Sequence, residues 1–272
     1  DGSLRRLSLL TLKRQEIWSA GTSPVPPAIH FDTISSDEKW LIGYEPQKEG
    51  GFRSFAINID TREKHILRSG PDNLNPHGQC DPDKPGRWLF QLIRRNDTNT
   101  RVPVFVHDWL NNSEPIQLPI GGDISAESSG HMAWVAKSGR IACAVNWNRK
   151  EKCHDKRHPE GNLLIAAPGD SRPIVFPATK HGFYHVSVSR CGRYFVSDDF
   201  MDFRINGFSD RGLGQTRIVV GNLNTGKSRV LIQDCQAYGI AGSSRYEPDP
   251  YFSADTKYVI YNASPFGITQ VF

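Results

Sequence analysis

Short runs of alternating apolar and polar residues recur along the chain, and each follows a compact polar turn. Five segments share one pattern: a polar turn, then lysine or arginine, then an aromatic or aliphatic residue that opens a strand-like run. They are SSDEKWLIGYE, DPDKPGRWLFQLI, AKSGRIACAVN, SRCGRYFVSDD and SADTKYVIYNA. Their aligned positions are Trp40, Trp88, Ile141, Tyr194 and Tyr258, which lie 48 to 64 residues apart. A repeat of this length indicates supersecondary units that stack side by side.

Two further strand-like runs lie between successive copies of this segment. The first set is SFAINI, VFVHDWL, LLIAA and RIVVGNL, and the second is KHILRSG, PIQLPIG, RPIVFPA and RVLIQD. Turns rich in Asp, Asn, Thr and Gly, such as DTRE and NTGK, join them. Four short strands per unit without an amphipathic helix predict an all-β fold, a β-propeller of four-stranded blades. A β-sandwich is the competing interpretation, but sandwiches lack this regular period.

The two ends of the chain also read as parts of blades. LRRLSLL and QEIWSAG fit the third and fourth strands of one blade, and ITQVF fits the third strand of another. Closing these ends as a five-bladed ring would supply the third strand twice. We therefore expect residues 1–272 to be a single propeller domain of about five blades that lacks the N-terminal blades of a larger ring.

Polar residues of one kind stand at the start of the first strand in each unit. They lie 9 to 11 residues before the aligned positions: His30, His77, His131, His185, and in the last unit Glu247 with Asp249. The repeat predicts that these side chains gather at one rim of the propeller, where Asp198 and Asp199 also end a second strand. Imidazoles and carboxylates that converge are what a metal site or an acid–base site needs. The alternative is that histidine merely suits a strand start that faces a solvated channel.

A second group of potential ligands lies in CAVNWNRKEKCHDKRHPEG. Cys143, Cys153, His154 and His158 could form a small zinc site together with His131. The spacing matches no standard zinc motif, so an incidental cysteine in a charged loop is the favoured interpretation.

Composition excludes some classes of function. The net charge of +4 is spread along the chain, so nucleic-acid binding is not expected. No apolar run approaches the ~20 residues that span a bilayer. Five cysteines in a chain of this length do not decide the redox compartment, and the N-terminus has no signal-peptide pattern. Localisation and oligomeric state are therefore not assigned from the sequence.

The segment EPDPYFSADTKYVIYNASPFGITQVF, together with SSGHMAWVAKSG and FYHVSVSRCGRYFVSDD, resembles oligogalacturonate lyase, a family of seven-bladed propeller enzymes of pectin breakdown. TRVPVFV is a weaker match to the arginine-bearing strand of that family. The resemblance follows blade order over almost the whole chain. It implies a full ring of seven blades and a catalytic site at the histidine-bearing rim.

Several residue roles follow from this resemblance. His131 falls on the proposed general base, Arg101 on the catalytic arginine, and His185 on a metal ligand. Glu247 and Asp249 stand where the family has its other two metal-binding histidines, and Ser244 stands where it has a ligand glutamine. Carboxylates fit manganese or calcium, and zinc is the weaker fit. Related propeller lyases that act on ulvan use His, Tyr and Arg, which makes Tyr184 a further catalytic candidate.

The sequence thus predicts a lyase that cleaves an acidic, uronate-containing oligo- or polysaccharide by β-elimination, with a divalent cation as cofactor. We expect His77, Arg204 and Arg245 to bind the substrate, which is oligogalacturonate or a glucuronate polymer such as ulvan. One alternative is a non-catalytic, TolB-like propeller that acts as a binding platform. A prolyl-oligopeptidase-type hydrolase is disfavoured because the chain has no G-x-S-x-G motif.

Overall fold

The described part of the chain consists of strands and turns. The computed structural model describes residues 3–8, 10–19, 29–95, 100–145, 154–199, 216–235, 247–263 and 269–272, and no α-helix occurs among them. Within these ranges no helix is present that could cross a membrane. The prediction of an all-β fold is confirmed.

Contacts between residues divide the chain into two compact units. The first comprises residues 1–100 and 105–115, and the second comprises residues 101–104 and 116–272. The sequence-based prediction of a single domain over 1–272 stays a prediction, and each unit is described by itself.

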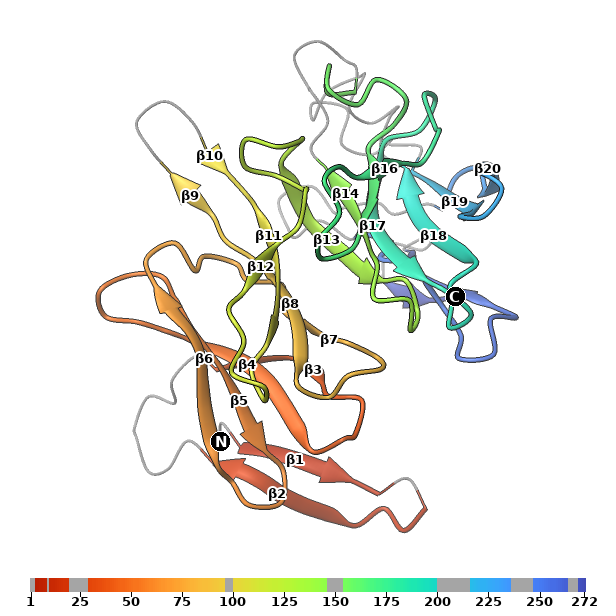
Figure 1. Ribbon diagram of the computed structural model, residues 1–272. Helices are drawn as coiled ribbons and strands as arrows, with labels where there is room; N and C mark the ends of the chain where they lie inside the picture. Colours follow the sequence, from red (N-terminus) through yellow and green to blue (C-terminus); the bar gives the residue numbers. More distant parts are fainter. Residues whose placement is uncertain are drawn as a thin grey trace. The chain divides into compact units, whose positions relative to one another are not determined.

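The first unit is built from antiparallel strands (Figure 1). Its two-stranded sheet has the order β1-β2, and its four-stranded sheet has the order β3-β4-β5-β6. The sheet that follows in the chain has the order β12-β11-β8-β7, of which β12 belongs to the second unit, and β9 pairs with β10. The bounds are β1 Ser3–Leu7, β2 Arg14–Ser19, β3 His30–Ile34, β4 Trp40–Pro46, β5 Phe52–Asn58, β6 Lys64–Gly70, β7 Gln79–Cys80, β8 Arg87–Gln91, β9 Arg94–Arg95, β10 Thr100–Arg101, β11 Val104–Asp108 and β12 Ile116–Gln117.

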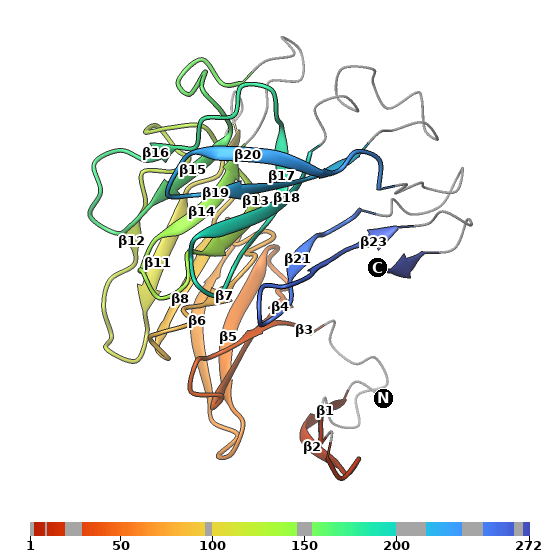
Figure 2. The same cartoon turned by 90° about the vertical axis from the view of Figure 1, so that its right-hand side faces the viewer.

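The second unit contains two complete four-stranded meanders, β13-β14-β15-β16 and β17-β18-β19-β20 (Figure 2). Two short pairs, β21-β22 and β23-β24, follow them. The bounds are β13 Ser128–Trp134, β14 Ile141–Val145, β15 Leu163–Ala166, β16 Ile174–Val175, β17 Phe183–Val188, β18 Tyr194–Asp199, β19 Arg217–Asn222, β20 Lys227–Ile232, β21 Tyr251–Phe252, β22 Val259–Ile260, β23 Asn262–Ala263 and β24 Gln270–Val271. Every predicted four-strand set is therefore present in its predicted order.

The repeated turn between the first and second strands has a common local cause. In the first, fourth and fifth copies a serine hydroxyl accepts a hydrogen bond from the backbone N–H of the residue five positions later, at 2.9–3.0 Å. The pairs are Ser35 with Trp40, Ser189 with Tyr194, and Ser253 with Tyr258. Each of these turns places one residue in the left-handed region, namely Glu38, Gly192 and Thr256. Short polar residues tolerate such turns and hydrogen-bond their own backbone, which is why the repeat is readable in the sequence.

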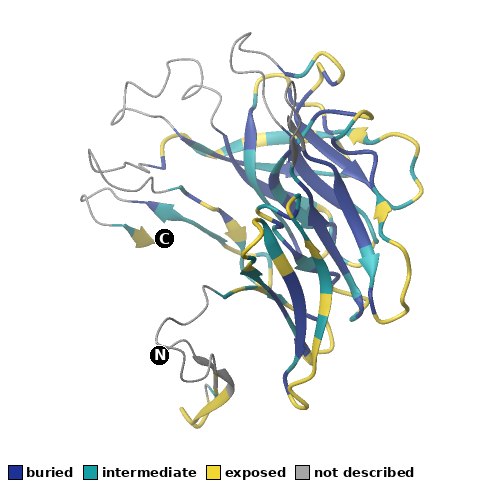
Figure 3. Cartoon of the chain, turned by 90° about the vertical axis from the view of Figure 1, so that its left-hand side faces the viewer, coloured by how far each residue is buried: buried dark blue, intermediate teal, exposed yellow. Residues whose placement is uncertain are grey.

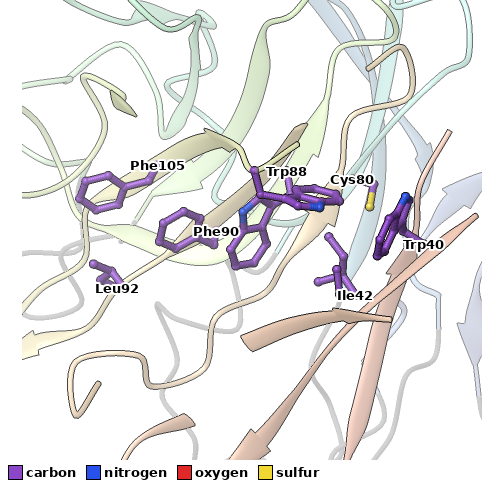
Figure 4. Close-up of a cluster of buried hydrophobic side chains, with 9 residues drawn as sticks. Trp40, Ile42, Cys80, Trp88, Phe90, Leu92 and Phe105 are labelled. Atoms are coloured by element: carbon purple, nitrogen blue, oxygen red, sulfur yellow. The ribbon is translucent and has the colours of Figure 1, made fainter. Parts of the chain in front are cut away.

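Buried residues lie mainly in the strands, and exposed residues lie mainly in the connecting turns (Figure 3). In the first unit the aligned residues Trp40 and Trp88 share one buried cluster with Phe90 and Phe105 (Figure 4). In the second unit the rings of Phe176, Phe183 and Phe195 meet edge to face, with centroids 4.9 to 6.2 Å apart. Phe183 opens β17, so this packing anchors the strand that carries the candidate site.

Candidate functional site

The first strands of three repeats contain an irregularity next to their histidines. The pairing register shifts between Phe31 and Thr33 in β3, between Ser128 and Met132 in β13, and between Phe183 and Val186 in β17. His131 lies within the second shift, and Tyr184 with His185 lies within the third. Bulges of this kind redirect side chains and are common beside active sites. The alternation of apolar and polar residues predicts the strands but not these bulges.

Within the bulge of β17, two backbone N–H groups donate hydrogen bonds to side chains of β18. The N–H of Tyr184 donates to the hydroxyl of Ser197 at 3.2 Å. The N–H of His185 donates to Oδ1 of Asp198 at 2.7 Å. Because both acceptors lie in β18 and are fully buried, they hold the bulge in one conformation.

Three rings from β13 and β17 contact one another. The His131 centroid lies 4.2 Å from that of His185 and 4.1 Å from that of Tyr184. Tyr184 and His185 are 4.6 Å apart, edge to face. β13 and β17 are neighbouring strands of successive repeats (Figure 1). The expectation that strand-start residues of different repeats gather together is therefore met for His131 and His185.

The carboxylates of the last repeat complete this group. Nε2 of His185 lies 3.3 Å from Oε2 of Glu247 and 3.1 Å from Oδ1 of Asp249. One potential ligand atom from each of these three residues lies within 4.8 Å of the others. One imidazole nitrogen with two carboxylate oxygens fits an oxygen-favouring divalent cation such as manganese or calcium. Among the described residues, this is the grouping that could hold a metal ion.

The carboxylates determine the protonation of His185. Burial disfavours its charged form, but the hydrogen bonds with Asp198 and Glu247, and the charges of Asp198 and Asp249, outweigh burial and raise the pKa of His185 to about 10. Burial also raises the pKa of Asp198, against the lowering effect of its bond with His185. The pKa of Asp249 is likewise raised by burial, and His185 partly offsets this rise. In the metal-free protein His185 is therefore a cation surrounded by carboxylates.

This charge pattern predicts a pH-dependent stability. The pKa of His185 is about 10 in the folded protein and about 6.5 when unfolded, so its contribution is full below pH 6.5 and is lost as pH rises through 10. In chelator, we expect urea denaturation to show that the free energy of unfolding falls between pH 7 and pH 10, by at most about 1.4 kcal/mol per pH unit. The slope should be shallower in His185→Gln. Equal slopes in both proteins would contradict the charge assignment.

A second His–Asp pair lies in the same hairpin but belongs to another cluster. Nδ1 of His181 is 2.7 Å from Oδ2 of Asp199, which also accepts from Arg217 at 3.0 Å. The N–H of Gly182 donates to Oδ1 of Asp199 at 2.9 Å. Successive residues of a strand face opposite sides of a sheet, which separates Asp199 from Asp198. Among the described contacts Asp199 pairs with His181 and Arg217, and the expectation that it reaches the same rim as Asp198 stays a prediction.

The other predicted site residues lie in the first unit, or their side chains lie outside the described part of the structure. His30 and His77 belong to the first unit, where the ring of His30 stacks on Tyr44 at 4.9 Å. Arg101 lies in β10, but its side chain is outside the described part of the structure. Arg204 and Arg245 lie outside the described residues, as does Ser244. Their proposed roles stay predictions.

The alternative zinc site gains no support among the described residues. Cys143 lies within β14, its Sγ is 3.4 Å from Oγ of Ser128, and burial raises the pKa of its thiol to about 12. A thiol held in its protonated form is a poor zinc ligand. His154 and His158 are buried, and Cys153 lies outside the described residues.

No protein-family profile and no curated protein matches the sequence. Among solved structures, TolB from Acinetobacter baumannii aligns with a TM-score of 0.62 and 12% identity, over 99% of this chain and 56% of that chain. A putative TolB from Agrobacterium tumefaciens aligns with a TM-score of 0.59 and 10% identity, over 99% of this chain and 83% of that chain. An acylaminoacyl peptidase from Pyrococcus horikoshii aligns with a TM-score of 0.59 and 11% identity, over 99% of this chain and 39% of that chain.

Oligogalacturonate lyase from Vibrio parahaemolyticus aligns with a TM-score of 0.35, at 11% identity over 99% of this chain and 95% of that chain. This score is too low to carry an argument, so the relation to that family stays a prediction. The likeness to the TolB structures, together with the four-stranded antiparallel meanders, shows the fold alone. The chain has the multi-bladed β-propeller fold.

Proposed function

We propose that the protein is a lyase that cleaves uronate-containing glycans by β-elimination. The observation that carries the proposal is the contact of His131, Tyr184 and His185 beside the carboxylates of Glu247 and Asp249. Such a group combines a proton acceptor with a place for a cation, and β-elimination next to a carboxylate requires both.

The reaction sets clear demands on the side chains. A base removes the proton next to the sugar carboxylate, the 4-linked oxygen leaves, and an unsaturated sugar remains. The half-buried His131 is our proposed base, because a neutral imidazole suits proton abstraction near pH 7. Tyr184, which contacts this ring, is our proposed donor of a proton to the leaving oxygen.

Negative charge that develops on the substrate carboxylate must be offset by positive charge. Arg101 is the proposed side chain for this role, as the family resemblance implies. His185, Glu247 and Asp249 would hold the divalent cation, which supplies Lewis acidity toward that carboxylate when it is bound. Two anionic ligands lower the net charge of the centre. We therefore expect manganese or calcium to bind in preference to zinc, and Arg101 to carry more of the charge compensation.

The proposal is tested with a panel of pectate oligomers, ulvan, glucuronan and alginate. We expect at least one of them to yield unsaturated product, measured as a rise in absorbance near ~235 nm, and a chelator to suppress the rise because it removes the cation. Readdition of manganese or calcium should restore it. No product from any polymer, with the protein folded and loaded with either cation, would contradict the lyase proposal.

A non-catalytic binding platform is the second candidate function. It is favoured by the two TolB structures, which align at TM-scores of 0.62 and 0.59. A binding platform does not require histidines and carboxylates to converge, so it leaves the group around His185 without a role. Binding of a polyuronate without any cleavage, measured by calorimetry on the same panel, would favour the platform over the enzyme.

A further inference from the structure

Asp198 holds His185 through two separate hydrogen bonds. Its Oδ1 accepts the backbone N–H of His185 at 2.7 Å, and its Oδ2 lies 2.6 Å from Nδ1 of the same residue. The side chain of Asp198 is fully buried, whereas that of His185 is 14% exposed. One carboxylate thus restrains both the main chain and the ring of the histidine.

These contacts determine which ring nitrogen faces the other carboxylates. An ionised carboxylate can only accept hydrogen bonds, so Nδ1 of His185 must carry the proton in this pair. The opposite nitrogen, Nε2, is then the atom available to a cation, and it is the atom that lies beside Glu247 and Asp249. A partner of this kind commonly fixes the tautomer and orientation of a ligand histidine.

The bulge in β17 makes this arrangement possible. The register of β17 against β18 shifts between Phe183 and Val186, and within this shift the N–H of His185 donates to a side chain of β18. Asp198 therefore compensates the N–H that the bulge releases and orients the ring that the bulge has redirected.

We propose that Asp198 is the positioning residue of this site, which fixes the tautomer and direction of His185 so that Nε2 can bind a divalent cation. The inference rests on the proposed cation site and deepens it. Asp198 itself does not contact the cation or the substrate; it acts through His185.

The chain offers a matched control, Asp199. It lies next to Asp198 in β18, is equally buried, and pairs with Nδ1 of a histidine, His181, at 2.7 Å. Asp198→Asn and Asp199→Asn therefore make the same chemical change at neighbouring buried positions. Only the first should affect the cation, since an amide nitrogen cannot accept the proton of Nδ1, so the neutral imidazole of His185 would keep its proton on Nε2, the atom that the cation needs.

The experiment measures Mn²⁺ binding to the full chain by calorimetry and by the electron paramagnetic resonance of free Mn²⁺. We expect Asp198→Asn to weaken binding about 10- to 100-fold, and Asp199→Asn to bind like the wild type. Circular dichroism and urea denaturation verify that each variant is folded. Equal affinities in the wild type and a folded Asp198→Asn would overturn the inference while leaving the cation site intact.

A second readout does not require cation binding or a folded variant of Asp198. ¹⁵N NMR of the imidazole rings, with His185 assigned by comparison with His185→Gln, should show Nδ1 protonated in the wild-type protein, with and without Ca²⁺. Nδ1 without a proton would overturn the positioning role. If Nδ1 is protonated but neither Mn²⁺ nor Ca²⁺ binds, Asp198 still orients His185. The cation of the proposed function would then be wrong, and so would the purpose that we assign to Asp198.

Discussion

Replacing His131 with alanine is expected to lower the rate of product formation by about 10²- to 10⁴-fold on the polymer that the panel identifies. The side chain is half-buried and contacts both Tyr184 and His185, so its removal takes away the proposed base without removing a proposed cation ligand. The loss should therefore appear in kcat, and Mn²⁺ affinity should stay near that of the wild type. Absorbance near ~235 nm and calorimetry measure the two quantities.

His65→Ala serves as the control for this variant. His65 lies in β6 of the first unit, is partly exposed and pairs with Glu63, so its loss should leave the rate unchanged. Tyr184→Phe tests the competing assignment of the base, because it keeps the ring and removes the hydroxyl. If Tyr184→Phe abolished the reaction and His131→Ala did not, the role of base would pass to Tyr184.

The double change Glu247→Gln with Asp249→Asn is expected to weaken Mn²⁺ binding by about 10²-fold or more, because the charge of the ligands governs the affinity for hard cations. The amides keep the size of both side chains and remove two negative charges beside Nε2 of His185. Calorimetric titration with Mn²⁺ and with Ca²⁺ measures the effect. The chelator-sensitive part of the activity should be lost along with the affinity.

Asp255→Asn is the matched control for the carboxylates. Asp255 lies in the same repeat, in the exposed turn that leads to the second strand, where it bonds with Ser253 and Lys257. Its neutralisation should change Mn²⁺ affinity little, since exposed charges outside the site are screened by solvent. Retention of Mn²⁺ affinity in the double variant would place the cation elsewhere in the protein.

The repeat was readable from local sequence because each of its signals acts over a few residues. Ser35 and Ser253 cap the same turn in different copies, and Trp40 and Tyr258 follow them at the same distance. Alternation of apolar and polar residues identified the strands between these turns. The prediction of four-stranded units was therefore correct.

The register shifts could not be predicted in the same way. A regular strand would send Tyr184 and His185 to opposite faces of the sheet, yet their rings lie 4.6 Å apart. The bulge that brings them together depends on Ser197 and Asp198 of another strand, which accept the released N–H groups. Sequence periodicity contains no signal for such a pairing, although an acidic residue at the end of the partner strand is a useful hint.

Local sequence was sufficient to predict the all-β class, the repeat, the turn chemistry, and the histidines and acids at the starts of first strands. These properties follow from alternation and turn preferences within short segments. The folded chain was needed to show that His131, Tyr184 and His185 touch, that Glu247 and Asp249 meet Nε2 of His185, and that Asp198 rather than Asp199 pairs with His185. Most of those contacts join residues of different strands or repeats, and they depend on sheet packing and on bulges that no local pattern encodes.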